Sequence, residues 1–295
     1  MSGDHYRPLS LAGIDSAQLS IEDLRSLVRQ ILDSRIHGIS FSPYVEGQGP
    51  GTVLNEAQIR DRLAIIAPHV HWIRSFSCTE GNELIPGIAT GSGFKTMVGV
   101  WLGDDHEKNE VELTRGIEIA KAGHASILAV GNEVLLRGDL SEDELLDYLE
   151  RAKQAVPDVD VGYVDAYFEF VDHPRITDAC DVILANCYPF WEGCPAEYAL
   201  LYMKEMYRRA QRAAKGKKVI ISETGWPNIG SPTMGSVPSY ENAIKYFINT
   251  YQWAEEEGVE IFYFSAFDES WKVEKEGDVG AYWGLWDKDG KPKYG

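Results

Sequence analysis

The stretch Val219-Ile220-Ile221-Ser222-Glu223-Thr224-Gly225-Trp226-Pro227 joins three apolar β-branched residues to a carboxylate and then to a Gly-Trp-Pro break. The apolar run predicts a buried strand, and the break predicts the loop that follows it. Ile127-Leu128-Ala129-Val130-Gly131-Asn132-Glu133 is built in the same way. A single glutamate after a strand is usually a solvated loop residue or a helix cap. Two such stretches in one chain instead predict two strands that each deliver a carboxylate.

These two strands belong to a series of eight that alternates with predicted helices. The expected strands span residues 38–44, 72–78, 95–102, 127–133, 161–167, 181–190, 218–223 and 261–269. Buried strands separated by helices imply a parallel sheet. Eight repeats favour a closed (β/α)8 TIM barrel, typically about 250 residues, over an open doubly wound sheet. Since no linker divides the chain, we expect a single domain over residues 1–295.

Amphipathic helices are predicted between the strands and also before the first one. Ser20 opens a capped helix over residues 20–33. No long helix is expected after the last strand, so we expect helix 20–33 to occupy the place of the missing eighth helix. Within the helix expected at 196–214, the stripe Tyr198, Leu201 and Met206 is interpreted as core.

Composition and charge exclude several function classes. The net charge of −18 argues against nucleic acids and anionic membrane surfaces as partners. The four cysteines form no C-x-x-C pair, so no metal site is expected; Cys187 and Cys194 could pair, with free thiols as the default. No dinucleotide or P-loop fingerprint is present, so no cofactor is expected. We expect a monomer.

No apolar run is long enough for a membrane span, and Met1-Ser2-Gly3-Asp4-His5-Tyr6-Arg7 lacks the apolar core of a signal peptide. The expected location is cytoplasmic if the chain is complete, and secreted or periplasmic if a leader was removed.

In a parallel barrel the carboxyl ends of the strands form one face, where active sites lie. The residues expected there are rich in aromatic rings, carboxylates and amides, and include Tyr44, Arg74, Phe76, Trp101, Asn132, Glu133, Asp165, Tyr167, Tyr188, Phe190, Trp191, Glu192, Glu223, Trp226, Glu269, Trp271 and Lys272. Sugars offer CH faces to aromatic rings and hydroxyls to polar groups, so this face suits a carbohydrate. Two carboxylates at one site are what cleavage of a glycosidic bond needs.

Five motifs at the strand ends resemble glycoside hydrolase family 17, the β-1,3-glucanase family. They are Val130-Gly131-Asn132-Glu133, Leu184-Ala185-Asn186-Cys187-Tyr188-Pro189-Phe190, Ser222-Glu223-Thr224-Gly225-Trp226-Pro227, Phe267-Asp268-Glu269-Ser270-Trp271-Lys272 and Trp283-Gly284-Leu285-Trp286. The resemblance implies a β-1,3-glucan or oligosaccharide substrate. Little more than one helix is predicted between Pro189 and Gly216, so the added subdomain of the plant endo-glucanases is expected to be absent.

The resemblance also implies roles for individual residues. Glu133 matches the general acid/base and Glu223 the nucleophile. Asn132 would bind the sugar 2-hydroxyl, and Tyr188 would orient the carboxylate of Glu223. Arg74 would pair with the nucleophile region, with a buried structural ion pair as the alternative.

Further substrate contacts are expected around these residues. Glu269 and Lys272 match a pair that supports the acid/base and binds substrate. Trp191 and Glu192 lie on the acceptor side by analogy, and the alternative for Trp191 is a loop anchor. The remaining expected contacts are Tyr44, Asp165 and Trp226.

The implied reaction is cleavage with retention, for which the two carboxyl groups should lie about 5–5.5 Å apart. Either water or a second glucan can accept the glycosyl group, so a hydrolase and a β-1,3-glucanosyltransferase share these residues. A non-catalytic glucan-binding protein is less favoured because both glutamates are present. A barrel aldolase would need a lysine inside a strand or a phosphate-binding loop, and neither is evident.

Overall fold

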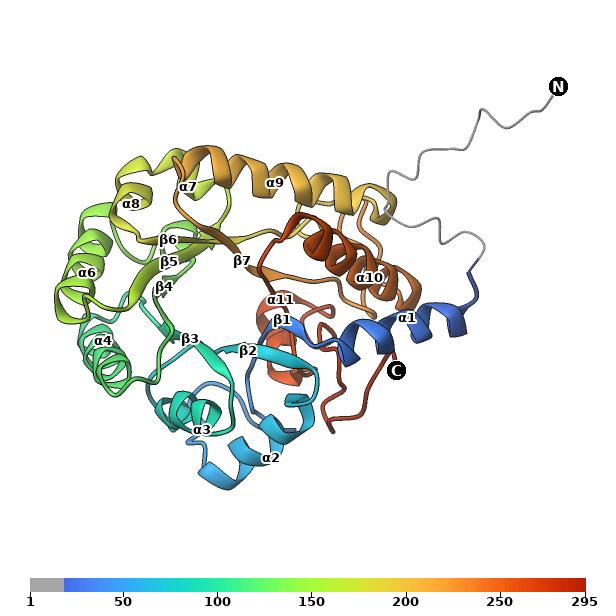
Figure 1. Ribbon diagram of the computed structural model, residues 1–295, viewed down its shortest axis with the longest axis horizontal. Coiled ribbons are helices and arrows are strands. Elements are labelled where there is room, and N and C mark those ends of the chain that lie inside the picture. Colours follow the sequence, from blue (N-terminus) through green and yellow to red (C-terminus); the bar gives the residue numbers. More distant parts are fainter. Residues whose placement is uncertain (1–18) are drawn as a thin grey trace.

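A computed structural model describes residues 19–295, and residues 1–18, with the Met1–Arg7 segment and the start of the expected domain, lie outside the described part. Eight parallel strands pair in sequence order and close between β8 and β1, which confirms the predicted (β/α)8 barrel (Figure 1). The strands are β1 Ile36–Ser40, β2 Val70–Arg74, β3 Lys95–Val100, β4 Ile127–Asn132, β5 Asp160–Ala166, β6 Val182–Asn186, β7 Val219–Thr224 and β8 Ile261–Tyr263.

Helices surround the barrel, and five of the longer ones begin at a polar cap visible in the sequence. Ser20 and Ser141 each form a capping box, and Asn55, Asp105 and Ser239 accept from a backbone N–H of the first turn. The α-helices are α1 Ile21–Asp33, α2 Glu56–Ile66, α3 Ile85–Gly91, α4 His106–Lys121, α5 Val134–Arg137, α6 Glu142–Ala155, α7 Glu169–Asp172, α8 Pro174–Ala179, α9 Ala199–Ala213, α10 Tyr240–Glu257 and α11 Val273–Glu276.

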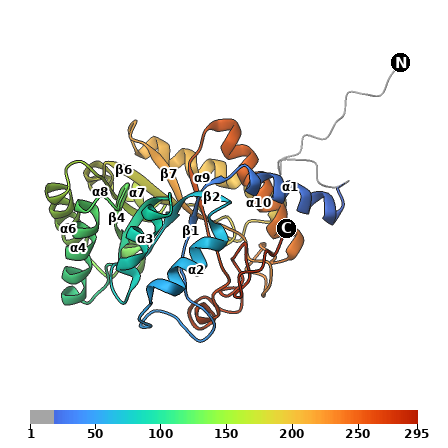
Figure 2. The same cartoon turned by 60° about the horizontal axis from the view of Figure 1, so that its bottom comes forward.

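Helix α1 takes the place of an eighth crossover helix, as the sequence predicts. In the described chain, β8 is followed only by the 3-10 turn η4 (Ser270–Lys272) and the single-turn helix α11. The buried face of α1 packs against α10, and Figures 1 and 2 both show the two helices side by side. Arg25 of α1 also donates a hydrogen bond of 2.8 Å to the hydroxyl of Tyr240.

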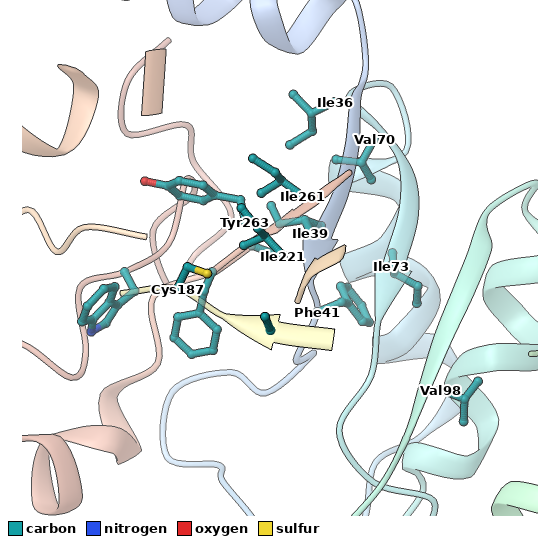
Figure 3. Packing of buried hydrophobic residues seen from close by; sticks show 14 of the residues in the cluster. Ile36, Ile39, Phe41, Val70, Ile73, Val98, Cys187, Ile221, Ile261 and Tyr263 are labelled. Carbon is teal, nitrogen blue, oxygen red and sulfur yellow. The ribbon is translucent and has the colours of Figure 1, made fainter. Parts of the chain in front are cut away.

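The core has two layers, because successive side chains of a strand point to opposite faces. The smaller layer fills the barrel and consists of Met97, Ile127, Ala129, Val164, Val182, Leu184, Ile220 and Phe262. The larger layer lies between strands and helices, and part of it is visible in Figure 3, with Ile36, Ile39, Val70, Ile73, Val98, Ile221 and Ile261 labelled. These layers give the barrel a packed interior below its carboxyl-end face.

The two strands that position Glu133 and Glu223, β4 and β7, depart from regular pairing. The register of β4 against β5 shifts between Ala129 and Asn132, and that of β7 against β8 shifts between Ile221 and Thr224. Gly131 has a φ of +86°, and a Cβ there would come within 3.0 Å of Val134. Glu133 itself has a φ of +51°, the left-handed region that few non-glycine residues adopt. Such a backbone occurs mostly where a site requires it.

Helix α9 corrects one sequence interpretation. Met206 is buried as expected, but Tyr198 and Leu201 are exposed, so they are not core. Between β6 and β7 the structure contains only the 3-10 turn η3 (Ala196–Tyr198) and α9, so the plant-type subdomain is absent there.

Other expectations concern cysteines and membranes. All four cysteines are free and buried, so Cys187 and Cys194 form no disulfide. Within residues 19–295 no helix has both the length and the apolarity to cross a bilayer.

Candidate active site

Arg74 lies at the centre of the polar network above the barrel core. It ends β2 and is 2% exposed. Its Nη1 donates to Oε1 of Glu223 and, at 3.3 Å, to the carbonyl of Ser222, while its Nη2 donates to Oδ1 of Asn132 at 2.7 Å. The guanidinium also lies 4.5 Å from the ring centroid of Phe76. One buried cation therefore joins the ends of β2, β4 and β7.

Glu223 is 6% exposed and accepts from two sides. Arg74 contacts Oε1, and the hydroxyl of Tyr188 donates to Oε2 at 2.7 Å. Burial and the neighbouring Glu223 carboxylate raise the pKa of Tyr188 well above its usual range, so its hydroxyl remains a donor. The two donors complement a carboxylate that carries its negative charge.

Glu133 lies at the tip of β4 in a different setting. The Nδ2 atom of Asn186 donates to its Oε1 at 2.8 Å, and Ser222 in turn donates to Oδ1 of Asn186 at 2.8 Å. Burial and the charge of Glu223 raise the pKa of Glu133 to about 7, against the opposing effect of the Asn186 hydrogen bond. The two glutamates therefore lie in unequal surroundings: Glu133 has a raised pKa, whereas Glu223 accepts hydrogen bonds from Arg74 and Tyr188.

Asn186 is the main site residue that the sequence reasoning left out. It ends β6 opposite Glu223 of β7, and its amide is shared between Glu133 and Ser222. It stands within one of the quoted motifs. An amide two positions after the barrel-filling Leu184 points inward by strand alternation, and that signal could have identified it.

Glu269 and Lys272 form a buried ion pair, with Nζ of Lys272 2.5 Å from Oε2 of Glu269. The indole N–H of Trp271 donates to the other carboxylate oxygen at 3.1 Å. The Lys272 ammonium lies 4.0 Å from the ring centroid of Phe264, which packs edge-on against Tyr188. The expected ion pair is therefore present, and through Phe264 it lies next to Tyr188, which donates to Glu223.

Trp191 and Glu192 are exposed beside this site. The ring of Trp191 lies 5.4 Å from that of Trp283, and Trp283 lies edge-on to Tyr188 at 5.6 Å. Oε2 of Glu192 accepts from the hydroxyl of Tyr202. Trp191 thus both packs on its neighbours and offers a ring face to solvent.

Three of the expected substrate contacts, Asp165, Trp226 and Tyr44, have buried side chains. Asp165 is fully buried and accepts from the Tyr163 hydroxyl and from the backbone N–H of Ala166, and burial raises its pKa to about 6. Trp226 is 1% exposed and donates its indole N–H to the carbonyl of Val237. Tyr44 is also buried, edge-on to Trp271. In the structure Asp165 and Trp226 are hydrogen-bonded within the protein, and their contact with substrate stays a prediction, as does that of Tyr44.

The described residues 19–295 contain no group of three or more histidine, cysteine, aspartate or glutamate side chains that could hold a metal ion.

Comparison with known proteins agrees with this geometry. The model of the BtgE/BtgC glycoside hydrolase domain matches residues 38–284. A glucan 1,3-beta-glucosidase of Candida albicans is 30% identical over 83% of this chain and 87% of its own length. One from Arthroderma benhamiae is 28% identical, over 83% and 85% respectively.

Solved structures lead to the same family. The glycoside hydrolase family 17 β-1,3-glucanosyltransferase from Rhizomucor miehei superposes with a TM-score of 0.79 at 27% identity, covering 88% of this chain and 96% of its own. An active-site mutant of the β-1,3-glucanosyltransferase from the same organism was solved with laminaritriose. The chain therefore belongs to glycoside hydrolase family 17, within the group defined by the BtgE/BtgC glycoside hydrolase domain.

Proposed function

We propose that this protein cleaves β-1,3-glucan or its oligosaccharides with retention of configuration, using Glu223 as nucleophile and Glu133 as general acid/base. The observation that carries the proposal is the unequal environment of the two glutamates. Glu223 accepts from the Arg74 guanidinium and the Tyr188 hydroxyl, whereas Glu133 has its pKa raised to about 7. A retaining mechanism needs one carboxylate that attacks and one carboxyl group that donates a proton.

In the first step the carboxylate of Glu223 attacks the anomeric carbon, while Glu133 gives its proton to the departing glycosidic oxygen. The products of this step are a glycosyl-enzyme ester, which holds the anomeric carbon, and a released fragment whose former glycosidic oxygen is now a free 3-hydroxyl. In the second step Glu133, now ionised, takes a proton from the acceptor hydroxyl, which attacks the same carbon and releases Glu223. Asn132, held by Arg74, is placed in this scheme to bind the sugar 2-hydroxyl.

The Glu269–Lys272 pair and the aromatic rings beside it form the proposed walls of the sugar site. Phe264, Tyr188 and Trp283 pack edge-on to one another, and Lys272 lies above Phe264. Rings and charged side chains together suit the CH faces and hydroxyl edges of glucose units. The names of the relatives, glucan 1,3-beta-glucosidase and β-1,3-glucanosyltransferase, support glucan as the substrate.

Transfer to a second glucan is the second candidate activity. The exposed ring of Trp191 and the carboxylate of Glu192 favour it, because together they offer an acceptor sugar a stacking face and a hydrogen-bond acceptor. Water competes at the same glycosyl-enzyme, so the outcome depends on how well an acceptor sugar binds there.

The test is incubation with a β-1,3-linked pentasaccharide, with products followed by mass spectrometry and early anomers by proton NMR. Shorter sugars that appear first as the β-anomer support retaining hydrolysis. Products longer than the substrate establish transfer. Products that appear first as the α-anomer would overturn the retaining mechanism, and an unchanged pentasaccharide would favour a binding protein. Glu223→Gln removes the proposed nucleophile. Its matched control is Glu255→Gln, on the exposed face of α10.

A further inference from the structure

Helix α9 presents apolar side chains to solvent next to the site. We call Trp191, Tyr198, Leu201 and Tyr202 the α9 ledge, and each is between 38% and 47% exposed. Tyr198 ends the 3-10 turn η3 and is the N-cap residue of α9, and Leu201 and Tyr202 follow it three and four positions later, the spacing of neighbours on one helix face. The opposite face of α9, which includes Leu200, Met203 and Met206, is buried against the barrel. The ledge is therefore a second apolar surface of the same helix, which core packing does not explain.

The ledge is physically continuous with the catalytic glutamates. The Tyr202 hydroxyl donates to Oε2 of Glu192, the residue that follows Trp191. Trp191 packs on Trp283, Trp283 packs edge-on to Tyr188, and Tyr188 donates to Glu223. A ligand that leaves the site over Trp191 therefore reaches Tyr202 next.

Glu192 is held in one orientation at the start of the ledge. A second hydroxyl, from Tyr167, donates to the same Oε2 atom at 3.4 Å, and the Arg209 guanidinium lies 5.0 Å from the Tyr167 ring centroid. The hydrogen bond to Glu192 raises the pKa of Tyr202 to about 12, so this hydroxyl stays a donor at working pH. Both bonds use Oε2, so neither of these two donors occupies Oε1.

We propose that the α9 ledge binds the distal sugar rings of a long β-1,3-glucan acceptor, and that Tyr202 is a positioning residue for Glu192. Alternating rings and a carboxylate match the CH faces and hydroxyls of a glucan chain, whereas a protein interface of this kind would bury a larger apolar area. The ledge begins where the acceptor side of the cleft ends, so the occupant is the continuation of the same chain. This inference rests on the proposed function.

The first experiment measures binding, in the Glu223→Gln background so that the sugars stay intact. Titration calorimetry compares a β-1,3-linked trisaccharide with a heptasaccharide. We expect the heptasaccharide to bind more tightly, and Tyr198→Ala to weaken it about five-fold, as the loss of one stacked ring implies. We expect a trisaccharide bound at the cleavage point not to reach Tyr198, so its affinity should change by less than about two-fold. Val111→Ala, on the exposed face of α4, is the control.

The second experiment tests Tyr202 in the active enzyme. Tyr202→Phe keeps the ring and removes the donor to Glu192. We expect KM for a long acceptor to rise about five-fold, with kcat of transfer changed by less than about two-fold, since the donor half of the site is untouched. A merely structural role would instead lower kcat or the melting temperature without a KM effect.

The outcomes separate the two proposals. If neither sugar binds and the pentasaccharide is not cleaved, the proposed function fails. The other outcome is that both sugars bind and the unmodified enzyme cleaves the pentasaccharide, but Tyr198→Ala leaves the heptasaccharide affinity unchanged and Tyr202→Phe leaves the acceptor KM unchanged. In that case the ledge proposal is overturned and the proposed function stands.

Discussion

The ends of β4 and β7 carry the same residue type in opposite surroundings. Glu223 at β7 meets a guanidinium and a phenol that both donate to it. Glu133 at β4 meets one amide donor and lies in the field of Glu223, and burial with that field raises its pKa to about 7. The partners that create the difference come from β2 and β6 and from the loop after β6, not from the sequence neighbours of either glutamate. The barrel, by bringing strand ends together, therefore sets the charge of each.

The largest effect that tests this difference is loss of the proposed nucleophile. Glu223→Ala should lower kcat/KM on the pentasaccharide by about 10⁴-fold or more, because no ester can form. Added azide should restore turnover and give a glycosyl azide of inverted configuration, since azide attacks from the vacated side. Recovery of the retained azide would assign the nucleophile elsewhere.

Loss of the proposed acid should be smaller and should depend on the leaving group. Glu133→Gln is expected to cost about 10²–10⁴-fold on the natural glycosidic bond. A dinitrophenyl glycoside needs no proton on its leaving group, so formation of the glycosyl-enzyme from it should be nearly unaffected, as a pre-steady-state burst would report.

The pH profile of the unmodified enzyme follows from the same assignment. Glu133 must be protonated to act as an acid, so kcat/KM should fall as pH rises through about 7. The fall should disappear in Glu133→Gln. A profile that stays flat to pH 9 in the unmodified enzyme would contradict the role of Glu133.

The raised pKa of Glu133 also affects the folding stability. The folded protein holds the proton of Glu133 up to a pKa of about 7, whereas its ordinary value is 4.5, so folding stability falls as pH rises from 4.5 to 7. Glu133→Gln removes this penalty and should stabilise the protein by about 3 kcal/mol at pH 8. Denaturant unfolding at pH 8 and pH 4 measures it, and the stabilisation should shrink at pH 4. Glu255→Gln should show no such pH dependence.

The smallest effects are on the pKa of Glu133 itself. Glu223→Gln removes a like charge and should lower it, by roughly one unit. Asn186→Ala removes a hydrogen bond to the charged form and should raise it. Carbon-13 NMR titration of labelled glutamate follows both changes. Shifts in the same direction for both variants would show that the two neighbours do not act as described.

The barrel could be predicted because its strands and long helices carry recognisable local patterns in the sequence. Apolar β-branched runs mark the strands, and Ser20, Ser141 and Ser239 mark helix starts. The placement of the two glutamates at strand ends followed from the same pattern. The short helices α7 and α8 before β6 could not be predicted, because each is too brief to show a helical period in the sequence.

The direction in which a side chain faces was harder to predict. Asp165 and Trp226 follow strands as the glutamates do, yet Tyr163 and the carbonyl of Val237 engage them below the surface. The spacing of Tyr198 and Leu201 is that of core residues, but both are exposed, Tyr198 at the end of η3 and Leu201 in α9. Tyr163 lies only two residues from Asp165, yet an apolar strand pattern does not show which polar partner a side chain will bind or which face of a helix stays open.

The irregular register of β4 and β7 has a consequence for redesigning the enzyme. In a regular strand only every second side chain points to the same face. Here the adjacent residues Asn132 and Glu133 both join one hydrogen-bond network. Ser222 and Glu223, which are also adjacent, join the same network. The extra residue in each strand doubles the number of functional groups that a short segment can contribute. A strand transplanted from an unbulged barrel would therefore carry only half of this chemistry, even with every catalytic residue type retained.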